Sequence, residues 1–310
     1  MEQRRDINQL MGIFKDKVSL LKATLSTKQT VSLIRVAVIR ATTHKPNTPP
    51  PDHRVSAILS LGNHSFLIQS LCIDTVINRL HKTHSPYVAL KCLIIMHNII
   101  SSGFSIFKKQ LTLQTLVERQ NALNLSLFRN DGCQESFQLA SWVRWYAGVI
   151  ECNLITSRNL GVSISSSRNK KVEFLNDNYV KEYLKVDSVL VKEINLLVLL
   201  VEEICKVPES VNYEKNVLVH DVMMLVGNDY RSTQHQIMSR LGELEGRVGR
   251  LRVSDSTELV NCLRRLEGCR GRLTEIFGNR MKNVEFWELV SFRKEAASNI
   301  GSRLLGWLDE

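Results

Sequence analysis

The sequence lacks the short motifs on which common enzyme sites are built. It contains no G-x-x-x-x-G-K-S/T phosphate loop, no G-x-G-x-x-G dinucleotide loop, no G-x-S-x-G nucleophile turn and no H-E-x-x-H zinc-binding helix. Each of these motifs positions a nucleophile, a phosphate group or a metal ion, so their absence argues against an enzyme. We therefore expect a protein without catalytic residues and without a cofactor.

Long hydrophobic runs are also missing. The most apolar segment, residues 88–100, is interrupted by Lys91 and His97 and is too short to span a bilayer. Residues 1–15 contain no continuous apolar region of the kind found in signal peptides. Glu2 stands where N-myristoylation requires glycine, and no C-terminal cysteine supports prenylation. Any membrane contact should therefore be peripheral, and His97 should be a hydrogen-bonded histidine of the core.

Motifs that pair cysteines or gather metal ligands are absent as well. The seven cysteines include no C-x-x-C pair, and we interpret them as buried, reduced thiols of a cytosolic protein. His81 and His84 are close enough to share a helix face, but no neighbouring carboxylate or thiol motif completes a metal site. We expect no bound metal and interpret these histidines as a surface pair at the end of a helix.

Apolar residues and positive charge are what the sequence contains in quantity. Its 310 residues are 44% apolar, which is ordinary for a folded protein and high for a disordered one. The net charge is +10, and residues 1–60 alone carry ten Lys and Arg against four acids. This basic bias attracts phosphate-rich partners, either an anionic membrane or a nucleic acid.

Apolar residues recur at helical spacing along most of the chain, with no alternating strand pattern. The sequence therefore predicts an all-α fold of stacked helix pairs, an α-solenoid. Pro86 suits the first position of a helix after Ser85, and Ser256 is a plausible N-terminal cap. The expected helices are residues 31–40, 54–61, 66–80, 86–102, 136–160, 190–204, 217–226, 233–251, 256–276 and 284–307.

A further amphipathic helix is predicted before these. Its polar face carries Lys15, Lys17 and Lys22, and we interpret it as a core helix with a solvated basic face. Insertion into a membrane is the alternative. Residues 136–160 are likewise expected to turn their aromatic side chains toward the core. The residues predicted to face inward are Ile7, Leu10, Met11, Phe14, Val18 and Leu21 in the first helix, and Phe137, Trp142, Trp145, Tyr146 and Val149 in the second.

Residues 40–54 form the one segment whose chemistry indicates a function. The preceding helix is apolar on nearly every side, which predicts burial between neighbours. Four of the chain's six prolines follow it and stiffen an exposed loop. The side chains that this loop is expected to expose are Arg40, His44, Lys45, His53 and Arg54, with one acid, Asp52, among them.

This segment resembles a known family. The A-T-x-H sequence of residues 41–44, the proline-rich loop, a histidine and the RVSAILSL helix resemble the ANTH domain of clathrin-assembly proteins, plant members most closely. Residues 87–97 resemble the aliphatic core helix of that family, and residues 141–147 its helix with aromatic residues and arginine. The resemblance spans about residues 8–290. It implies an ANTH/ENTH-type α-solenoid that continues into a C-terminal bundle of long helices.

The resemblance also implies a domain organisation. Residues 1–310 form a single ANTH-like domain: an N-terminal solenoid (1–160), a flexible Gly/Ser-rich loop (161–175) and a C-terminal helical bundle (176–310). In this family a disordered tail binds clathrin, and we expect that tail to be absent. Residues 304–310 only partly resemble a clathrin-binding peptide, so support for clathrin as a partner is weak.

The family's phosphoinositide pocket maps onto the loop. Arg40 matches the basic residue at the end of the helix and His53 the histidine behind the prolines, while Lys45 and Arg54 are adjacent cations. The positions of the family's two loop bases read Pro50 and Asp52 here. Because a hydrogen bond to a charged group contributes about 1.5–3 kcal/mol, this change should weaken head-group binding by several kcal/mol.

The function that follows is a non-enzymatic adaptor of clathrin-mediated endocytosis. It would bind phosphatidylinositol 4,5-bisphosphate and lie peripherally on plasma-membrane coated pits, clathrin-coated vesicles and the Golgi from the cytoplasmic side. By resemblance, a vesicle SNARE is a further partner. The alternative is a helical protein-interaction scaffold that has lost lipid binding. Nucleic-acid binding ranks last, because the sequence has no interleaved exposed aromatics and no known module.

Overall fold

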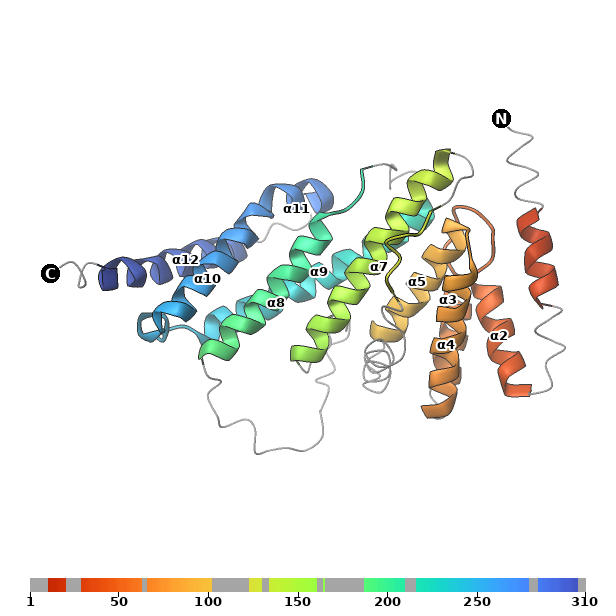
Figure 1. Ribbon diagram of the computed structural model, residues 1–310, viewed down its shortest axis with the longest axis horizontal. Coiled ribbons are helices and arrows are strands. Elements are labelled where there is room, and N and C mark those ends of the chain that lie inside the picture. Colours follow the sequence, from red (N-terminus) through yellow and green to blue (C-terminus); the bar gives the residue numbers. More distant parts are fainter. Residues whose placement is uncertain are drawn as a thin grey trace. The chain divides into compact units, whose positions relative to one another are not determined.

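The computed structural model describes residues 11–20, 29–62, 66–101, 123–129, 134–160, 164, 187–209, 216–278 and 284–305. Within these ranges the regular elements are helices and no strand occurs, so the predicted all-α class is confirmed (Figure 1). Residues 11–20 are helical. The other elements are α2 (Gln29–Ala41), α3 (Asp52–Gly62), α4 (Phe66–Lys82), α5 (Pro86–Ser101), α7 (Gln134–Leu160), α8 (Asp187–Cys205), α9 (Val217–Glu243), η1 (Val248–Arg250), α10 (Val253–Gly268), α11 (Arg270–Phe277) and α12 (Val284–Leu305).

The chain divides into two compact units. The first consists of Met1–Arg158 together with Val207–Val226, and the second of Asn159–Lys206 together with Gly227–Glu310. The first unit is therefore built from two separate stretches of sequence, and α9 contributes its beginning to this unit and the rest to the other.

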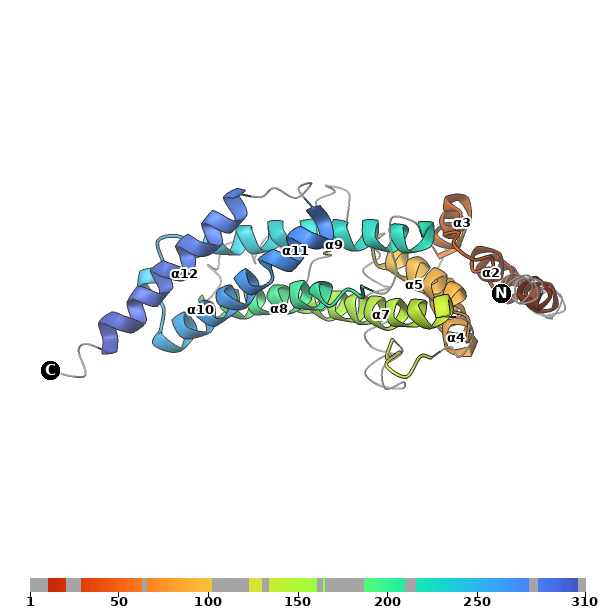
Figure 2. The same cartoon turned by 90° about the horizontal axis from the view of Figure 1, so that it is seen from above.

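In the first unit, α2, α3, α4 and α5 pack side by side, each against the next (Figures 1 and 2). Helix α5 begins at Pro86 as predicted, and 13 of its 16 residues are buried. Two of these buried residues, Lys91 and His97, are polar. His97 Nδ1 lies 3.0 Å from the hydroxyl of Tyr146, so the expectation of a hydrogen-bonded core histidine is confirmed.

In the second unit, α10 packs against both α8 and α12 (Figure 2). The stripe predicted along α8 is buried throughout: Leu190, Ile194, Leu197, Val201 and Ile204. A buried ion pair joins α8 to α9, with Arg240 Nε 2.7 Å from a carboxylate oxygen of Glu193. Long helices packed along apolar stripes confirm the predicted bundle for the described part of this unit.

Several predicted helix ends are wrong. One helix, α9, runs through the break expected after residue 226, and two helices, α10 and α11, replace the single helix expected at 256–276. Ser256 is not a cap, because α10 already begins at Val253 and the Ser256 hydroxyl donates to the Ala297 carbonyl at 2.8 Å. Cys269 separates the two helices, since it follows the last residue of α10 and precedes the first of α11.

Three inward-facing assignments are also wrong. Met11 and Phe14 are exposed, because the helix of residues 11–20 turns Gly12 and Asp16 inward instead. Phe137 is exposed at the start of α7, whereas Trp142, Trp145, Tyr146 and Val149 are buried as expected. The helix before the loop, α2, is buried along one face and not all round, with Leu33 61% exposed. Predictions for Ile7, Leu10, Leu21, Lys22, residues 306–310 and most of residues 161–175 lie outside the described residues.

Candidate functional site

Lys91 of α5 binds the segment between α2 and α3 from the protein interior. Its ammonium group donates to the carbonyl of Thr43 at 2.8 Å and to the carbonyl of Lys45 at 2.7 Å. Lys91 is 1% exposed, and burial, with the charges of Lys45 and Arg79, lowers its pKa to about 8. A single buried cation thus satisfies two loop carbonyls that no helix or strand ladder serves.

Arg79 of α4 forms the second anchor. Its Nε donates to the Thr42 hydroxyl at 2.5 Å, and its Nη2 donates to the Thr42 carbonyl at 2.8 Å. The Thr42 hydroxyl in turn donates to the Val38 carbonyl at 2.7 Å in the last turn of α2. The guanidinium fork therefore fixes the point at which α2 ends and the loop begins.

Asp16 completes this framework from the helix of residues 11–20. One carboxylate oxygen accepts from the backbone N–H of His44 at 2.8 Å, and the other lies 2.7 Å from His44 Nδ1 and 3.1 Å from Arg79 Nη2. Burial alone would raise the pKa of Asp16, but the hydrogen bonds from His44 and the charge of Arg79 outweigh it and leave this pKa lowered. The carboxylate is therefore held in its charged form.

The four predicted site residues lie in or next to the segment that Lys91, Arg79 and Asp16 hold. Arg40 is exposed at the end of α2, and its carbonyl accepts a hydrogen bond from the guanidinium of the half-buried Arg54. Lys45 and His53 are exposed, the first in the loop and the second in the first turn of α3. The structure brings Arg40 and Arg54 together, and it fixes the backbone of Lys45 through Lys91.

Two residues, His44 and Pro50, differ from the exposed loop that the sequence predicts. His44 was expected in solvent but is bound to Asp16 and mostly buried, so that expectation is wrong. Pro50 is buried, and Asp52 is exposed as the first residue of α3. The Asp52 carboxylate also helps to raise the pKa of Asp221, although burial of Asp221 is the larger cause. Asp52 thus adds negative charge next to the exposed His53.

Sequence reasoning missed the anchoring residues Asp16, Arg79 and Lys91 as parts of this site. Lys91 did carry a signal, because a lone lysine inside an apolar run must find buried acceptors. Asp16 and Arg79 carried none, since they lie 28 and 37 residues from the loop residues that they bind.

The helix of residues 11–20 also presents apolar residues to solvent beside the loop. Met11, Ile13 and Phe14 are exposed, the last by 64%, and Lys15 and Lys17 are exposed next to them. Because Asp16 binds His44, this mixed apolar and basic surface lies at the same end of the first unit as Arg40 and Lys45. It has the residue types that suit the interface of a membrane.

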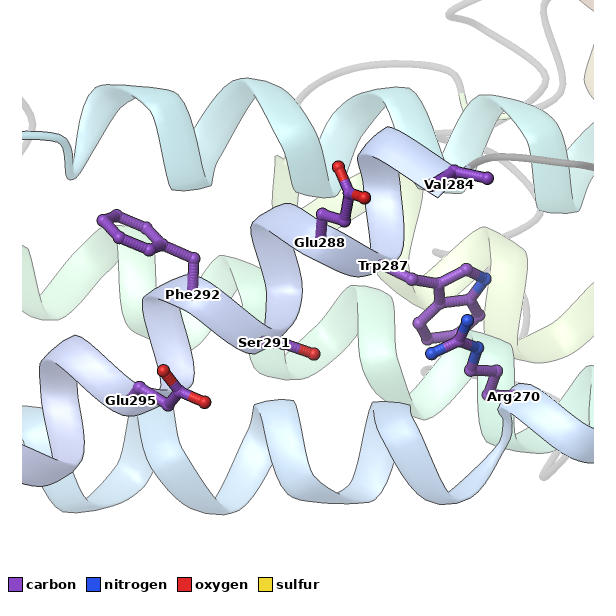
Figure 3. Close-up of a pocket in the computed structure, with 7 residues that line it drawn as sticks. All are labelled: Arg270, Val284, Trp287, Glu288, Ser291, Phe292 and Glu295. Carbon is purple, nitrogen blue, oxygen red and sulfur yellow. The ribbon is translucent and has the colours of Figure 1, made fainter.

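Other features of the described residues offer less. A hollow of about 340 Å³ lies along α12, where the Arg270 guanidinium stacks over the Trp287 ring at 5.5 Å (Figure 3). Its remaining lining is Val284, Glu288, Ser291, Phe292 and Glu295. His81 and His84 are exposed at the end of α4 and just beyond it, as the surface-pair interpretation expects.

Two kinds of feature are absent from the part of the chain that the structure describes. Within that part of the chain, no group of three or more His, Cys, Asp or Glu side chains is placed to hold a metal ion. None of the helices described is long and apolar enough to cross a bilayer.

Comparison with known proteins gives consistent matches over nearly the whole chain. The model of the ANTH domain family matches residues 33–286. "Putative clathrin assembly protein At4g40080" of Arabidopsis thaliana is 37% identical over 297 residues, which cover 94% of this chain and 81% of that protein. "Putative clathrin assembly protein At5g65370" of the same plant is 30% identical over 298 residues, which cover 92% of this chain and 98% of that protein.

Proposed function

The chain belongs to the ANTH domain family, and from that premise we propose that it is a non-enzymatic, peripheral adaptor of clathrin-mediated endocytosis. Its relatives are named as clathrin assembly proteins, and the similarity to two of them covers more than nine-tenths of this chain. The absence of enzyme motifs in the sequence supports the same class.

The proposed ligand is the head group of phosphatidylinositol 4,5-bisphosphate at Arg40, Lys45, His53 and Arg54. The observation that carries this proposal is the pair of exposed cations, Arg40 and Lys45. Hydrogen bonds from Arg54 and Lys91 hold their backbone carbonyls. Charge-assisted hydrogen bonds to phosphate are among the strongest that side chains make. A backbone that is already ordered loses little entropy when the ligand binds.

Membrane contact gains support from the helix of residues 11–20. Its exposed Met11, Ile13 and Phe14 can enter the interfacial region of a bilayer while Lys15 and Lys17 meet anionic lipid. Each basic residue near an anionic surface contributes about 1 kcal/mol of attraction. This surface would hold the head-group site against the membrane even where a single head group binds weakly.

The finer parts of the proposal follow from the family resemblance. The protein would act from the cytoplasm at coated pits of the plasma membrane, on clathrin-coated vesicles and at the Golgi. Clathrin and the helix of a vesicle SNARE are the proposed protein partners. Residues 176–310, which the sequence assigns to the C-terminal bundle, would hold the SNARE helix.

Liposome flotation of an Arg40→Glu/Lys45→Glu variant tests the head-group site. Both side chains are exposed, so reversing them should leave the fold intact. We expect wild type to float with phosphatidylinositol 4,5-bisphosphate more than with phosphatidylserine at matched charge, and the variant to lose at least tenfold in affinity for the first lipid. Arg250→Glu/Arg252→Glu reverses two exposed cations of the second unit and is the matched control.

Asp52 supplies a test in the opposite direction. Asp52→Asn keeps a residue that suits a helix start but removes the charge that repels phosphate. We expect several-fold tighter binding to phosphatidylinositol 4,5-bisphosphate liposomes. Equal flotation of wild type with both lipids, or none, would contradict the head-group site.

The buried Pro50 and the exposed Asp52 favour a second candidate, a scaffold that has lost lipid binding. A lysine at position 50 would have to leave the interior to meet a phosphate, so the present backbone does not offer that contact. If the double variant and wild type float alike, the scaffold is the better description, and helical protein cargo becomes its expected partner.

A further inference from the structure

The Asp16 carboxylate is bound as a ligand would be. Both of its oxygens are engaged, by the His44 backbone N–H, by the His44 ring and by the Arg79 guanidinium, at 2.7–3.1 Å. These groups are donors of the kind that bind phosphate oxygens in proteins. The side chains of Asp16, His44 and Arg79 are all less than one-fifth exposed, so the carboxylate is held in a partly enclosed site.

The charges around this site do not balance. Arg79 and Lys91 are two cations that donate to carbonyls of the loop, and Lys45 is a third, exposed cation in the loop itself. Asp16 is the acid that pairs with this group in the described structure. One carboxylate among these cations leaves an excess of positive charge, which favours an anion of higher charge at the same place.

The helix that delivers Asp16 also contacts the loop through Gly12. Gly12 lies one turn before Asp16 on the same face, and a Cβ added at Gly12 would come within 2.7 Å of His44 Cβ. The opposite face of this helix is exposed at Ile13, Phe14 and Lys17. Its described contacts with the loop therefore run along the Gly12–Asp16 face, and exchange of the Asp16 carboxylate would release them.

We propose that the His44 N–H, the His44 ring and the Arg79 guanidinium form an anion seat that Asp16 fills as an internal ligand and that a phosphate group fills when the helix of residues 11–20 leaves. The inference rests on the proposed function, because a phosphoinositide at Arg40 and Lys45 would bring a second phosphate close to this seat. The shared ligand chemistry is a phosphate monoester, either on a lipid head group or on a soluble inositol phosphate.

Asp16→Asn is the direct test, because it removes the charge of the internal ligand and keeps its shape. An internal ligand lowers apparent affinity by the fraction of time for which it occupies the site. We expect calorimetric titration with inositol 1,4,5-trisphosphate to show about tenfold tighter binding to Asp16→Asn than to wild type. Glu288→Gln removes an exposed carboxylate from α12 and should change nothing. Unchanged affinity in folded Asp16→Asn overturns the proposal.

A second substitution identifies the seat itself. Arg79→Lys in the Asp16→Asn background keeps a positive charge but loses the guanidinium fork, and it should abolish the tenfold gain. A gain that survives Arg79→Lys places the added phosphate elsewhere and overturns the assignment. Titration with the trisphosphate decides whether the seat binds a phosphate group, and flotation with lipid then shows whether a membrane head group also reaches it.

Two further measurements keep this inference separate from the proposed function and from folding. In the Arg40→Glu/Lys45→Glu background, the gain from Asp16→Asn should persist for the soluble trisphosphate even if liposome binding is lost. Should Asp16→Asn fail to fold, deuterium exchange of wild type answers the question. Saturating trisphosphate should speed exchange of amides in residues 11–20 several-fold, and unchanged exchange would overturn the proposal.

Discussion

Lys91 is the residue on which the position of the loop depends most directly. It is buried in α5 and serves two loop carbonyls, so its charge is paired with dipoles and only distantly with an acid. Burial is the largest cause that lowers its pKa, from 10.5 to about 8. A buried lysine of this kind stabilises the loop because it donates to carbonyls that would otherwise be desolvated without a partner.

The pH dependence that follows has a definite sign. Because the folded-state pKa of Lys91 lies below the unfolded value, the unfolded chain binds more protons between pH 8 and 10.5. The contribution of Lys91 to stability therefore rises with pH across this window and is least below pH 8. At 1.36 kcal/mol for each pH unit, the gain is on the order of 3 kcal/mol.

Carbon-13 NMR of labelled lysines measures this directly. One lysine resonance should titrate near pH 8, and that resonance should be missing from Lys91→Met. If every lysine titrates above pH 10, Lys91 is solvated and the account of the loop anchor is wrong.

At the residue level, the sequence predicted a basic cluster but not the partners of the loop. It marked Arg40, Lys45, His53 and Arg54 as one basic cluster, and a contact between Arg40 and Arg54 is present. It placed His44 in solvent, because a histidine in a proline-rich loop gives no sign of an acid 28 residues earlier. The partners of a loop are set by tertiary packing, which local pattern does not encode.

At the scale of elements, the packing of the helix of residues 11–20 against the loop depends on Gly12. Gly12→Ala would raise helix propensity by about 1 kcal/mol, yet its Cβ would lie 2.7 Å from His44 Cβ, which cannot swing away as the end of a long side chain could. We expect the helix to stay helical and to leave the loop.

Limited trypsin digestion detects this release. Cleavage after the exposed Lys15 and Lys17 should be several-fold faster in Gly12→Ala than in wild type. Met11→Ala changes an exposed neighbour and is the control. Equal cleavage rates in all three proteins would show that the Gly12 contact does not hold the helix.

Helix existence was predicted well from sequence, and helix ends less well. The sequence predicted a break between residues 226 and 233, where polar residues follow Gly227. These residues instead support the helix, because Gln234 donates to the Tyr230 hydroxyl at 2.8 Å and Tyr230 stacks on Phe277 at 5.2 Å. The pattern of polar residues did not reveal this, because it records neither the hydrogen bond within α9 nor the ring contact with α11.

At the scale of the molecule, the predicted fold class and family resemblance are both confirmed. They were accessible because apolar periodicity persists over ten segments and because residues 41–53 form a distinctive motif. The return of Val207–Val226 to the first unit was not accessible, since no local signal records which unit a helix joins. Whether the head-group site binds lipid stays a prediction.

Because the chain divides into two units, the proposed site can be tested independently of the second unit. Arg40, Lys45, His53 and Arg54 and the residues that anchor them all belong to the first unit. The second unit contains the buried Arg240–Glu193 pair, with side chains 6% and 11% exposed. Breaking a buried pair by removing one partner costs about 3–5 kcal/mol, because the other charge stays buried without compensation.

Arg240→Gln should therefore lower the free energy of unfolding by about 3 kcal/mol or more in urea denaturation followed by circular dichroism. The folded variant at low temperature should still float with phosphatidylinositol 4,5-bisphosphate liposomes within twofold of wild type. Glu193→Leu/Arg240→Met replaces the pair with apolar residues and should recover much of the lost stability. Loss of lipid binding by a folded Arg240→Gln protein would mean that the head-group site needs the second unit, and the assignment of the site to the first unit alone would then be wrong.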